Sequence, residues 1–177
     1  MMRVITGSAR GRKLKSPADE SVRPTSDRVK EAVFSIIQFE LEGRRVLDLF
    51  AGSGQMGIEA LSRGAERAVF VDSSKEAIGI VKDNLASTKL SENAVVLHAD
   101  ALAFLRESGQ IFDIIFADPP YKEGIILKML PLAAARVAPG GILMVETPYG
   151  EKLPETAGDL TRTKEYKYGK TAITTYR

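Results

Sequence analysis

The chain has 177 residues, no cysteine, a single histidine and a formal net charge of +2. Without cysteine it has no disulfide, no thiolate ligand and no cysteine nucleophile, and His98 alone cannot form a metal cluster, so no metal is expected. No apolar run approaches the length of a membrane span, and the first residues lack the apolar core of a signal peptide. We therefore expect a cytoplasmic protein with no membrane partner.

The N-terminal segment carries most of the positive charge. Residues 1–30 contain eight basic and three acidic residues, a net charge of +5, whereas residues 31–150 have a net charge of −5. A basic arm on an acidic body predicts contact with a polyanion, and a solvated charged tail is the alternative. Residues 3–14 contain two short runs around a Gly-Ser-Ala-Arg-Gly turn and predict a β-hairpin. We divide the chain into this arm with its loop (residues 1–24) and a main domain (residues 25–177).

The main domain begins with a helix. Thr25 or Ser26 can cap it, and apolar residues recur at helical spacing to about residue 40. From residue 44 strands and helices alternate, which predicts an α/β fold with a mostly parallel sheet and helices on both faces. Strands are expected over residues 45–49, 68–72, 94–99, 111–117 and 141–146, a closing hairpin over 164–168 and 171–176, and helices over 55–63, 74–86, 100–107 and 124–137.

Four of the expected strands finish at an aspartate, namely Asp48, Asp72, Asp100 and Asp118. In open α/β sheets the ligand binds outside the carboxyl ends of the strands, so four acceptors are aimed at one crevice. Asp100 has an alternative role as a helix cap.

A glycine motif follows the first of these strands. Residues 52–57 read Gly-Ser-Gly-Gln-Met-Gly and match the pattern G-x-G-x-x-G, with Asp72 near the spacing of an acid that binds a ribose. In dinucleotide-binding proteins such a loop holds an anionic pyrophosphate. Here Asp48 places a carboxylate at the loop entrance, where it would repel pyrophosphate but attract an ammonium or a sulfonium. S-adenosylmethionine carries both of these cations, so we favour it over a dinucleotide.

The strand over residues 111–117 runs directly into Asp118-Pro119-Pro120-Tyr121. Proline has no N–H and holds the residue before it extended, so this corner offers acceptors but few donors. The Asp118 carboxylate and nearby carbonyls can accept hydrogens from an exocyclic amine, while the Tyr121 ring covers one face of a nucleobase turned out of its stack. The plain alternative is a Pro-Pro turn that ends a strand, with the tyrosine packed against it.

Together these motifs resemble the class I S-adenosylmethionine-dependent methyltransferases that methylate amino groups. The resemblance implies a Rossmann-like fold with a mostly parallel seven-stranded sheet. It also implies that Asp48 lies near the amino group of the cofactor, that Asp72 binds its ribose and that Asp100 binds its adenine amine. The implied cofactor-binding residues are Asp48, Phe50, Ala51, Gly52, Gly54, Asp72, Asp100 and Ala101, and the implied catalytic residues are Asp118, Pro119, Pro120 and Tyr121.

The N-terminal sequence narrows the resemblance. Residues 4–14 and the Arg-Pro-Thr-Ser-Asp-Arg-Val block over residues 23–29 are similar to the RsmD family, whose members methylate the N2 amine of a guanine in bacterial 16S ribosomal RNA. The likeness covers nearly the whole chain, although Ser35 stands where members often carry Asn. It implies 16S ribosomal RNA as the partner, either alone or within the assembled small ribosomal subunit.

Contacts with the RNA backbone are expected from the basic arm, because phosphate contacts dominate affinity and its salt dependence. The expected residues are Arg10, Arg12, Lys13, Arg23, Thr25 and Arg28. Arg23 and Arg28 could instead tie the arm to the acidic body. No association element is evident in the sequence, so we expect a monomer.

Two other functions stay open. Adenine-N6 methylation of DNA uses the same type of Pro-Pro corner, although this chain is short for an added target-recognition domain. A non-catalytic RNA-binding or ribosome-assembly factor could keep the fold without the reaction. Three further residues, His98, Met129 and Met144, lie within apolar patterns and are predicted to be core residues.

Overall fold

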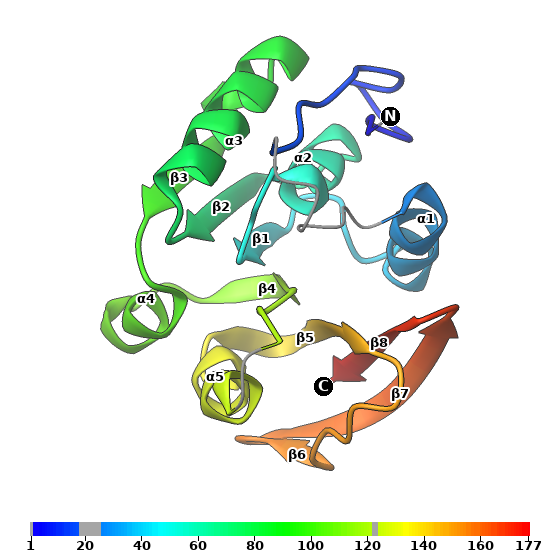
Figure 1. Cartoon of the computed structure of the whole chain (residues 1–177), viewed down its shortest axis with the longest axis vertical. Helices are drawn as coiled ribbons and strands as arrows, with labels where there is room; N and C mark the ends of the chain where they lie inside the picture. Colours follow the sequence, from blue (N-terminus) through cyan, green and yellow to red (C-terminus); the bar gives the residue numbers. More distant parts are fainter. Residues whose placement is uncertain (1, 18–25, 122–123) are drawn as a thin grey trace.

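The central feature of the molecule is one mixed β-sheet. Figure 1 shows the computed structural model, which describes residues 2–17, 26–121 and 124–177, so Arg23 and Thr25 lie outside the described residues. The strand order is β3-β2-β1-β4-β5-β8-β7-β6. Strands β1 to β5 pair in parallel, and β8, β7 and β6 continue the sheet antiparallel. The predicted α/β sheet is confirmed.

The order of elements matches the predicted alternation. Within the described residues the sheet has eight strands rather than the seven expected, because the two-residue strand β6 pairs with β7 at the edge. Strand β5 begins earlier than predicted because its first residue pairs with Phe112 before a register shift. The elements are α1 (Asp27–Ile36), β1 (Arg45–Leu49), α2 (Gln55–Ser62), β2 (Arg67–Asp72), α3 (Lys75–Thr88), a 3₁₀ turn (Ser91–Asn93), β3 (Ala94–His98), α4 (Ala101–Glu107), β4 (Phe112–Ala117), α5 (Ile125–Ala134), β5 (Val137–Pro148), β6 (Thr156–Ala157), β7 (Leu160–Tyr168) and β8 (Thr171–Tyr176).

Helices cover both faces of the sheet. Helices α1, α2 and α3 pack on one face and α4 and α5 on the other, each over its own apolar cluster (Figure 1). On the first face, Phe34 of α1 packs against Phe116 of β4 with ring centroids 5.4 Å apart. Central strands of such a sheet are buried on both sides, which explains why β1 and β4 read as nearly continuous apolar runs.

The N-terminal hairpin (residues 2–14) lies against α2 and α3 (Figure 1). An antiparallel bridge joins Arg3 to Lys13, and the Leu14 N–H donates to the Met2 carbonyl over 2.9 Å, so the predicted hairpin is confirmed. Val4 and Leu14 are buried in the cluster beneath α2. The hairpin is therefore basic on its outside and part of the core on its inside.

Of the three side chains predicted to lie in the core, two are buried and one is exposed. Met129 and Met144 are buried, as predicted. His98 is not a core residue: it ends the edge strand β3 and is exposed, with its Nε2 atom 2.9 Å from the Ser73 carbonyl. Because β3 is an outermost strand of the sheet, His98 is not buried as the apolar pattern had indicated. In the described part of the chain, no helix has the length and apolar content that a membrane span requires.

Candidate active site

Four carboxylates lie at the carboxyl edge of the sheet. Asp48 of β1 pairs with Phe70 of β2 and Phe116 of β4. Asp72 and Asp118 therefore lie two residues farther along the strands on either side of it. Asp100 follows β3, one strand farther out. The sheet thus brings the four predicted aspartates to one edge of four neighbouring strands.

The loop that leaves β1, the glycine loop (residues 50–57), is held by its backbone conformation. Phe50 has a φ of 63°, which is rare for a bulky side chain and places backbone strain where the chain leaves the strand. Gly52 and Gly54 have φ values of 55° and 77°, which glycine adopts without such strain. At Gly57 a Cβ atom would lie 2.3 Å from the Phe70 ring, so only glycine lets α2 approach β2 this closely.

Asp48 is the most buried of the four carboxylates. Asp48 is 4% exposed, and its Oδ2 atom accepts the Gly57 N–H over 2.8 Å. Burial raises the pKa of Asp48 to about 8, opposed by the Gly57 hydrogen bond and reinforced by the charges of Asp72 and Asp118. Asp48 forms no ion pair within the described residues. A buried carboxylate without a cation is suited to a positively charged ligand.

Gln55 is an unpaired acceptor within the glycine loop. It is the first residue of α2, it is 6% exposed, and its Oε1 atom has no hydrogen-bond partner among the described residues. Buried polar atoms are rarely left unpaired in native proteins, so a ligand with a donor group fits here. Sequence analysis did not single out Gln55, although its place inside the glycine motif was a signal.

Asp72 joins β2 to the glycine loop. Its Oδ2 atom accepts the Gly52 N–H and its Oδ1 atom accepts the Ser74 N–H, both over 2.8 Å. Each oxygen retains a second lone pair, so Asp72 can fix the loop and still accept hydroxyl hydrogens from a ligand.

Asp100 caps the next helix. Its Oδ1 atom accepts the Ala103 N–H over 2.8 Å at the start of α4, which confirms the alternative role considered for it. The side chain is exposed at the edge of the sheet, whereas Ala101 is buried. Capping and ligand binding are compatible, because a carboxylate accepts several hydrogen bonds.

The Asp-Pro-Pro-Tyr corner (residues 118–121) follows β4. Pro119 is buried, while Asp118, Pro120 and Tyr121 are exposed. The Tyr121 hydroxyl donates to the Asp118 carboxylate, which lowers the pKa of Asp118, but the surrounding protein has the larger effect and raises that pKa to about 6. The Tyr121 pKa is raised by the partial burial of its hydroxyl and by the charges of Asp118 and Glu146. At neutral pH Asp118 is therefore an ionised acceptor beside an aromatic ring that is 58% exposed.

A buried charge cluster anchors the N-terminal hairpin to α2. The Glu59 carboxylate accepts the N–H groups of Ile5 and Thr6 over 2.8 and 2.9 Å. Lys30 of α1, which is fully buried, donates to the Arg3 carbonyl and lies 3.8 Å from Glu59. Burial lowers the pKa of Lys30, and the neighbouring carboxylate of Glu59 opposes that effect. Sequence analysis missed this anchor.

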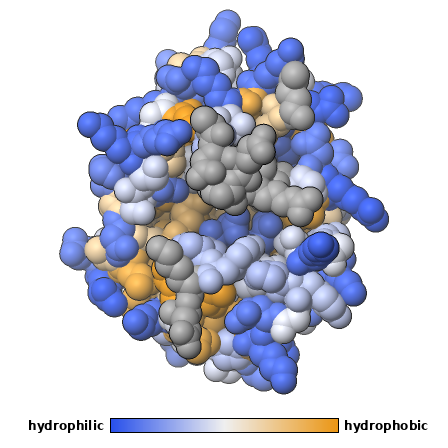
Figure 2. All heavy atoms as spheres, in the orientation of Figure 1, coloured by the Kyte–Doolittle hydropathy of each residue, from blue (hydrophilic) through white to orange (hydrophobic). Residues whose placement is uncertain are grey.

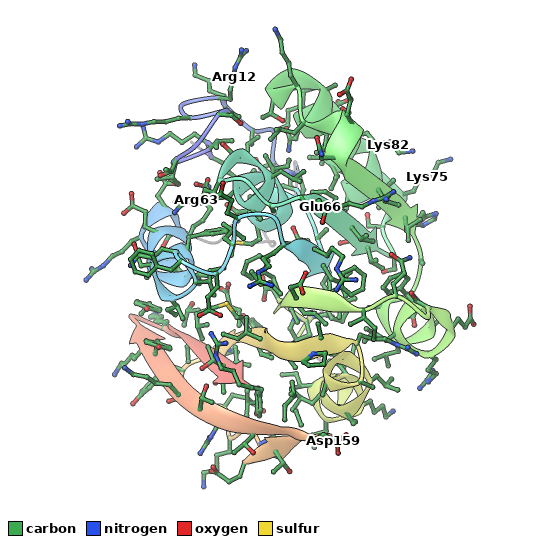
Figure 3. All side chains as sticks on the ribbon, turned by 180° about the vertical axis from the view of Figure 1, so that it is seen from behind. Arg12, Arg63, Glu66, Lys75, Lys82 and Asp159 are labelled. Carbon is green, nitrogen blue, oxygen red and sulfur yellow. The ribbon has the colours of Figure 1, made fainter. Side chains whose placement is uncertain are left out.

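Arg63 completes the anchor on α2. Its guanidinium pairs with Glu59 over 2.8 Å and lies 4.7 Å from the centre of the Phe34 ring, so it points toward α1 (Figure 3). A cavity of about 430 Å³ opens beside it, between the hairpin, the segment after α1 and the end of α2. The i,i+4 spacing of Glu59 and Arg63 was the sequence signal for this pair.

Asn84 of α3 connects the hairpin to the glycine loop. Its Nδ2 atom donates to the carbonyls of Lys15 and Ser53 over 3.0 and 2.9 Å, and its Oδ1 atom accepts the Lys15 N–H over 2.7 Å. The side chain is 1% exposed. One buried amide therefore binds both the segment expected to meet RNA and the loop expected to bind the cofactor.

The basic residues expected to contact RNA face outward where the structure describes them. Arg10, Arg12, Lys13 and Arg28 are exposed, and none forms an ion pair with another described residue. Arg12 projects from the hairpin into the solvent (Figure 3). Hydrophilic residues dominate the surface around the hairpin, whereas apolar residues reach the surface near α5 (Figure 2).

Comparison with known proteins gives consistent results. The model of a family described as conserved hypothetical protein 95 matches residues 2–177. The chain is 45% identical to YlbH of Bacillus subtilis, with 99% of this chain and 98% of YlbH covered. It is 33% identical to ribosomal RNA small subunit methyltransferase D of Escherichia coli, with 99% and 89% covered. The solved structure of yhhF from Escherichia coli, 33% identical, superposes with a TM-score of 0.88 over 99% of this chain and 96% of that one.

Proposed function

The chain belongs to the RsmD family of ribosomal RNA methyltransferases, and we propose that it methylates the exocyclic N2 amine of a guanine in 16S ribosomal RNA with S-adenosylmethionine. The observation that carries this proposal is the position of Asp48 directly beside β4, on which the Asp-Pro-Pro-Tyr corner follows. A site for a cationic group and a site for an amine thus lie on adjacent strands.

The described residues fit S-adenosylmethionine better than a dinucleotide. Asp48 is buried without a cation, Gln55 has an unpaired acceptor, and a Cβ atom at Gly52 would meet open space. We assign the amino group of the cofactor to Asp48, the methionine part to residues 50–54, the ribose to Asp72 and the adenine amine to Asp100. The bound cofactor would supply a methyl group activated by attachment to a sulfonium.

The target amine is a poor nucleophile because its lone pair is delocalised into the guanine ring. Asp118 and the Pro119 carbonyl would each accept one of its hydrogens, which favours a tetrahedral nitrogen and frees the lone pair. Holding the two reactants in line can contribute about 7–11 kcal/mol to catalysis. The excess proton leaves to water after transfer. Because its pKa is about 6, Asp118 acts as a charged acceptor rather than as a strong base.

Tyr121 would hold the guanine once it leaves its stack. Its hydroxyl is bound to Asp118, which fixes the ring beside the acceptor. Base–aromatic stacking is worth about 1–3 kcal/mol per base, a useful offset to the cost of unstacking. Phosphate contacts from Arg10, Arg12, Lys13 and Arg28 would hold the flanking RNA. The same role is proposed for Arg23 and Thr25 on the basis of the sequence alone.

The test is a methylation assay with small ribosomal subunits from cells that lack this gene. Wild-type protein and S-adenosylmethionine should produce N2-methylguanosine in the digested 16S RNA, and the Asp118→Asn variant should produce it far more slowly. Methylated adenine in DNA would favour the DNA alternative. RNA binding without any cofactor binding in calorimetry would favour a non-catalytic assembly factor. Naked 16S RNA, tested in parallel, identifies which form of the substrate is used.

A further inference from the structure

A second group of basic and aromatic residues lies at the carboxyl edge of the sheet. We call it the β7–β8 tip and define it as Tyr149, Lys167 and Lys170, all of them exposed. The Tyr149 N–H donates to the Lys170 carbonyl over 2.8 Å, so the segment after β5 and the β7–β8 turn form one unit. Sequence analysis predicted this hairpin only as an element that closes the sheet.

Strand directions put the tip at the same edge as the active site. Strand β5 runs parallel to β4, and its last residue, Pro148, pairs with Thr171, the first residue of the antiparallel strand β8. The β7–β8 turn therefore lies at the edge where Asp118 follows β4. In the strand order β4-β5-β8-β7 the tip is on the far side of the corner from β1 and the glycine loop.

The tip has the chemistry of an RNA-binding surface. The Lys167 Nζ atom lies 3.9 Å from the centre of the Tyr149 ring, and Tyr149 is 49% exposed. Neither Lys167 nor Lys170 forms a salt bridge with another described residue. An exposed aromatic ring beside one ammonium group, with a second exposed lysine in the same unit, suits a stacked base with its phosphates.

A further exposed cation, Arg28, lies on helix α1. Arg28 is the second residue of α1, and Glu40, four residues past the end of that helix, pairs with Arg177 after β8 over 2.7 Å. Because β8 ends at the amino edge of the sheet, Arg28 lies toward the carboxyl edge. A polyanion that crosses the carboxylates of the active site would be repelled by them, so it needs cations on both sides.

We propose that the β7–β8 tip is a second RNA-binding surface, which holds the strand on the far side of the target guanine from the N-terminal hairpin. This proposal rests on the proposed function, because it requires an RNA substrate. The two surfaces together would fix the direction in which the RNA passes the Asp-Pro-Pro-Tyr corner. Tyr149 would stack on a base, and Lys167 and Lys170 would each bind a phosphate.

The test compares two double variants that each remove two positive charges. Lys167→Gln/Lys170→Gln alters the tip, whereas Arg67→Gln/Lys89→Gln alters exposed residues at the amino edge of the sheet, at the start of β2 and just after α3. Affinity for naked 16S RNA is measured by fluorescence anisotropy at several salt concentrations. The tip variant should bind more weakly, and the slope of log affinity against log salt should become shallower by about 1 to 2. The amino-edge variant should match the wild type.

Tyr149→Leu separates stacking from charge. It should weaken RNA binding about 5- to 150-fold and leave the salt slope unchanged. Cofactor affinity and thermal unfolding should be unaltered in every variant. Equal losses of RNA affinity in both double variants, or no loss in the tip variant, would overturn the proposal. A loss of affinity seen only with assembled subunits would also overturn it, because the tip would then contact a ribosomal protein. If the wild type neither binds nor methylates RNA, it is the proposed function that fails.

Discussion

Cofactor binding should depend on pH through a single buried carboxyl group. Asp48 is 4% exposed, accepts one hydrogen bond and forms no ion pair within the described residues, and burial raises its pKa to about 8. A cationic cofactor binds the ionised carboxylate. At pH 6.5 about 3% of Asp48 is ionised and at pH 7.5 about 24%, so affinity should rise about eightfold over that unit. Above about pH 8 the cofactor's own amino group loses its charge, and the rise should stop.

The assay is titration calorimetry of S-adenosylmethionine at pH 6.5 and 7.5, in two buffers with different enthalpies of ionisation. About 0.9 proton should be released per cofactor bound near pH 7, because binding ionises Asp48. Asp48→Asn keeps an acceptor for the Gly57 N–H but cannot ionise, so its affinity should be nearly constant with pH and no proton should be released. A wild-type affinity that does not change with pH, or an Asn variant that keeps the slope, would refute the reasoning.

The same carboxyl group affects the stability of the protein without cofactor. Its folded pKa of about 8 lies above the ordinary value of 3.8, so between those values the folded protein holds a proton that the unfolded chain has released. The free energy of unfolding should therefore fall as pH rises through this window, relative to that of Asp48→Asn. Urea unfolding of both proteins at pH 5 and pH 8 measures the difference.

Three further predictions concern the glycine loop, the hairpin and the corner. Gly57→Ala should lower the free energy of unfolding by roughly 1–3 kcal/mol and weaken cofactor binding, because the added Cβ meets the Phe70 ring at 2.3 Å. The control, Gly79→Ala on α3, has open space around it and should raise the free energy of unfolding by about 0.5–1 kcal/mol. Urea unfolding measures both. Asn84→Ala should cost roughly 1–3 kcal/mol and weaken both cofactor binding and protease resistance of the hairpin, and loss of stability with neither of these changes would limit Asn84 to packing. Asp118→Asn should slow methyl transfer by at least about 100-fold while cofactor affinity stays within about twofold. The wild-type rate should rise with pH through about 6 as Asp118 ionises. Cofactor binding that falls together with activity would place Asp118 in the cofactor site instead.

Sequence patterns predicted the parts of the fold that depend on local order along the chain. The alternation of strands and helices predicted the parallel sheet. The four aspartates at the ends of strands lie at one edge of that sheet because parallel strands run in the same direction. The position of the carboxyl edge therefore followed from residues such as Asp48 and Asp118 without any contact information.

Contacts between distant elements could not be predicted in this way. The anchor joins Lys30 and Glu59, two residues that are 29 positions apart in the sequence. Asn84 looks like an ordinary polar residue of α3 until the hairpin lies against it. His98 illustrates the opposite error, because it was predicted to be a core residue and its strand lies at the edge of the sheet. Burial depends on which strand is outermost, and a single sequence does not encode that order locally.

The distribution of charge explains how one edge of the sheet can bind a cation and a polyanion together. The carboxylates of Asp48 and Asp72 lie inside the edge, where low hydration strengthens their attraction for the cationic cofactor. The basic groups of the hairpin and of the β7–β8 tip lie outside, where exposed phosphates can reach them. Over a separation of about 10 Å, physiological salt screens exposed charges from one another, so the RNA phosphates experience the basic flanks more than the buried carboxylates. A guanine turned out of the RNA is uncharged, and it is therefore the part of the substrate that can enter the acidic centre.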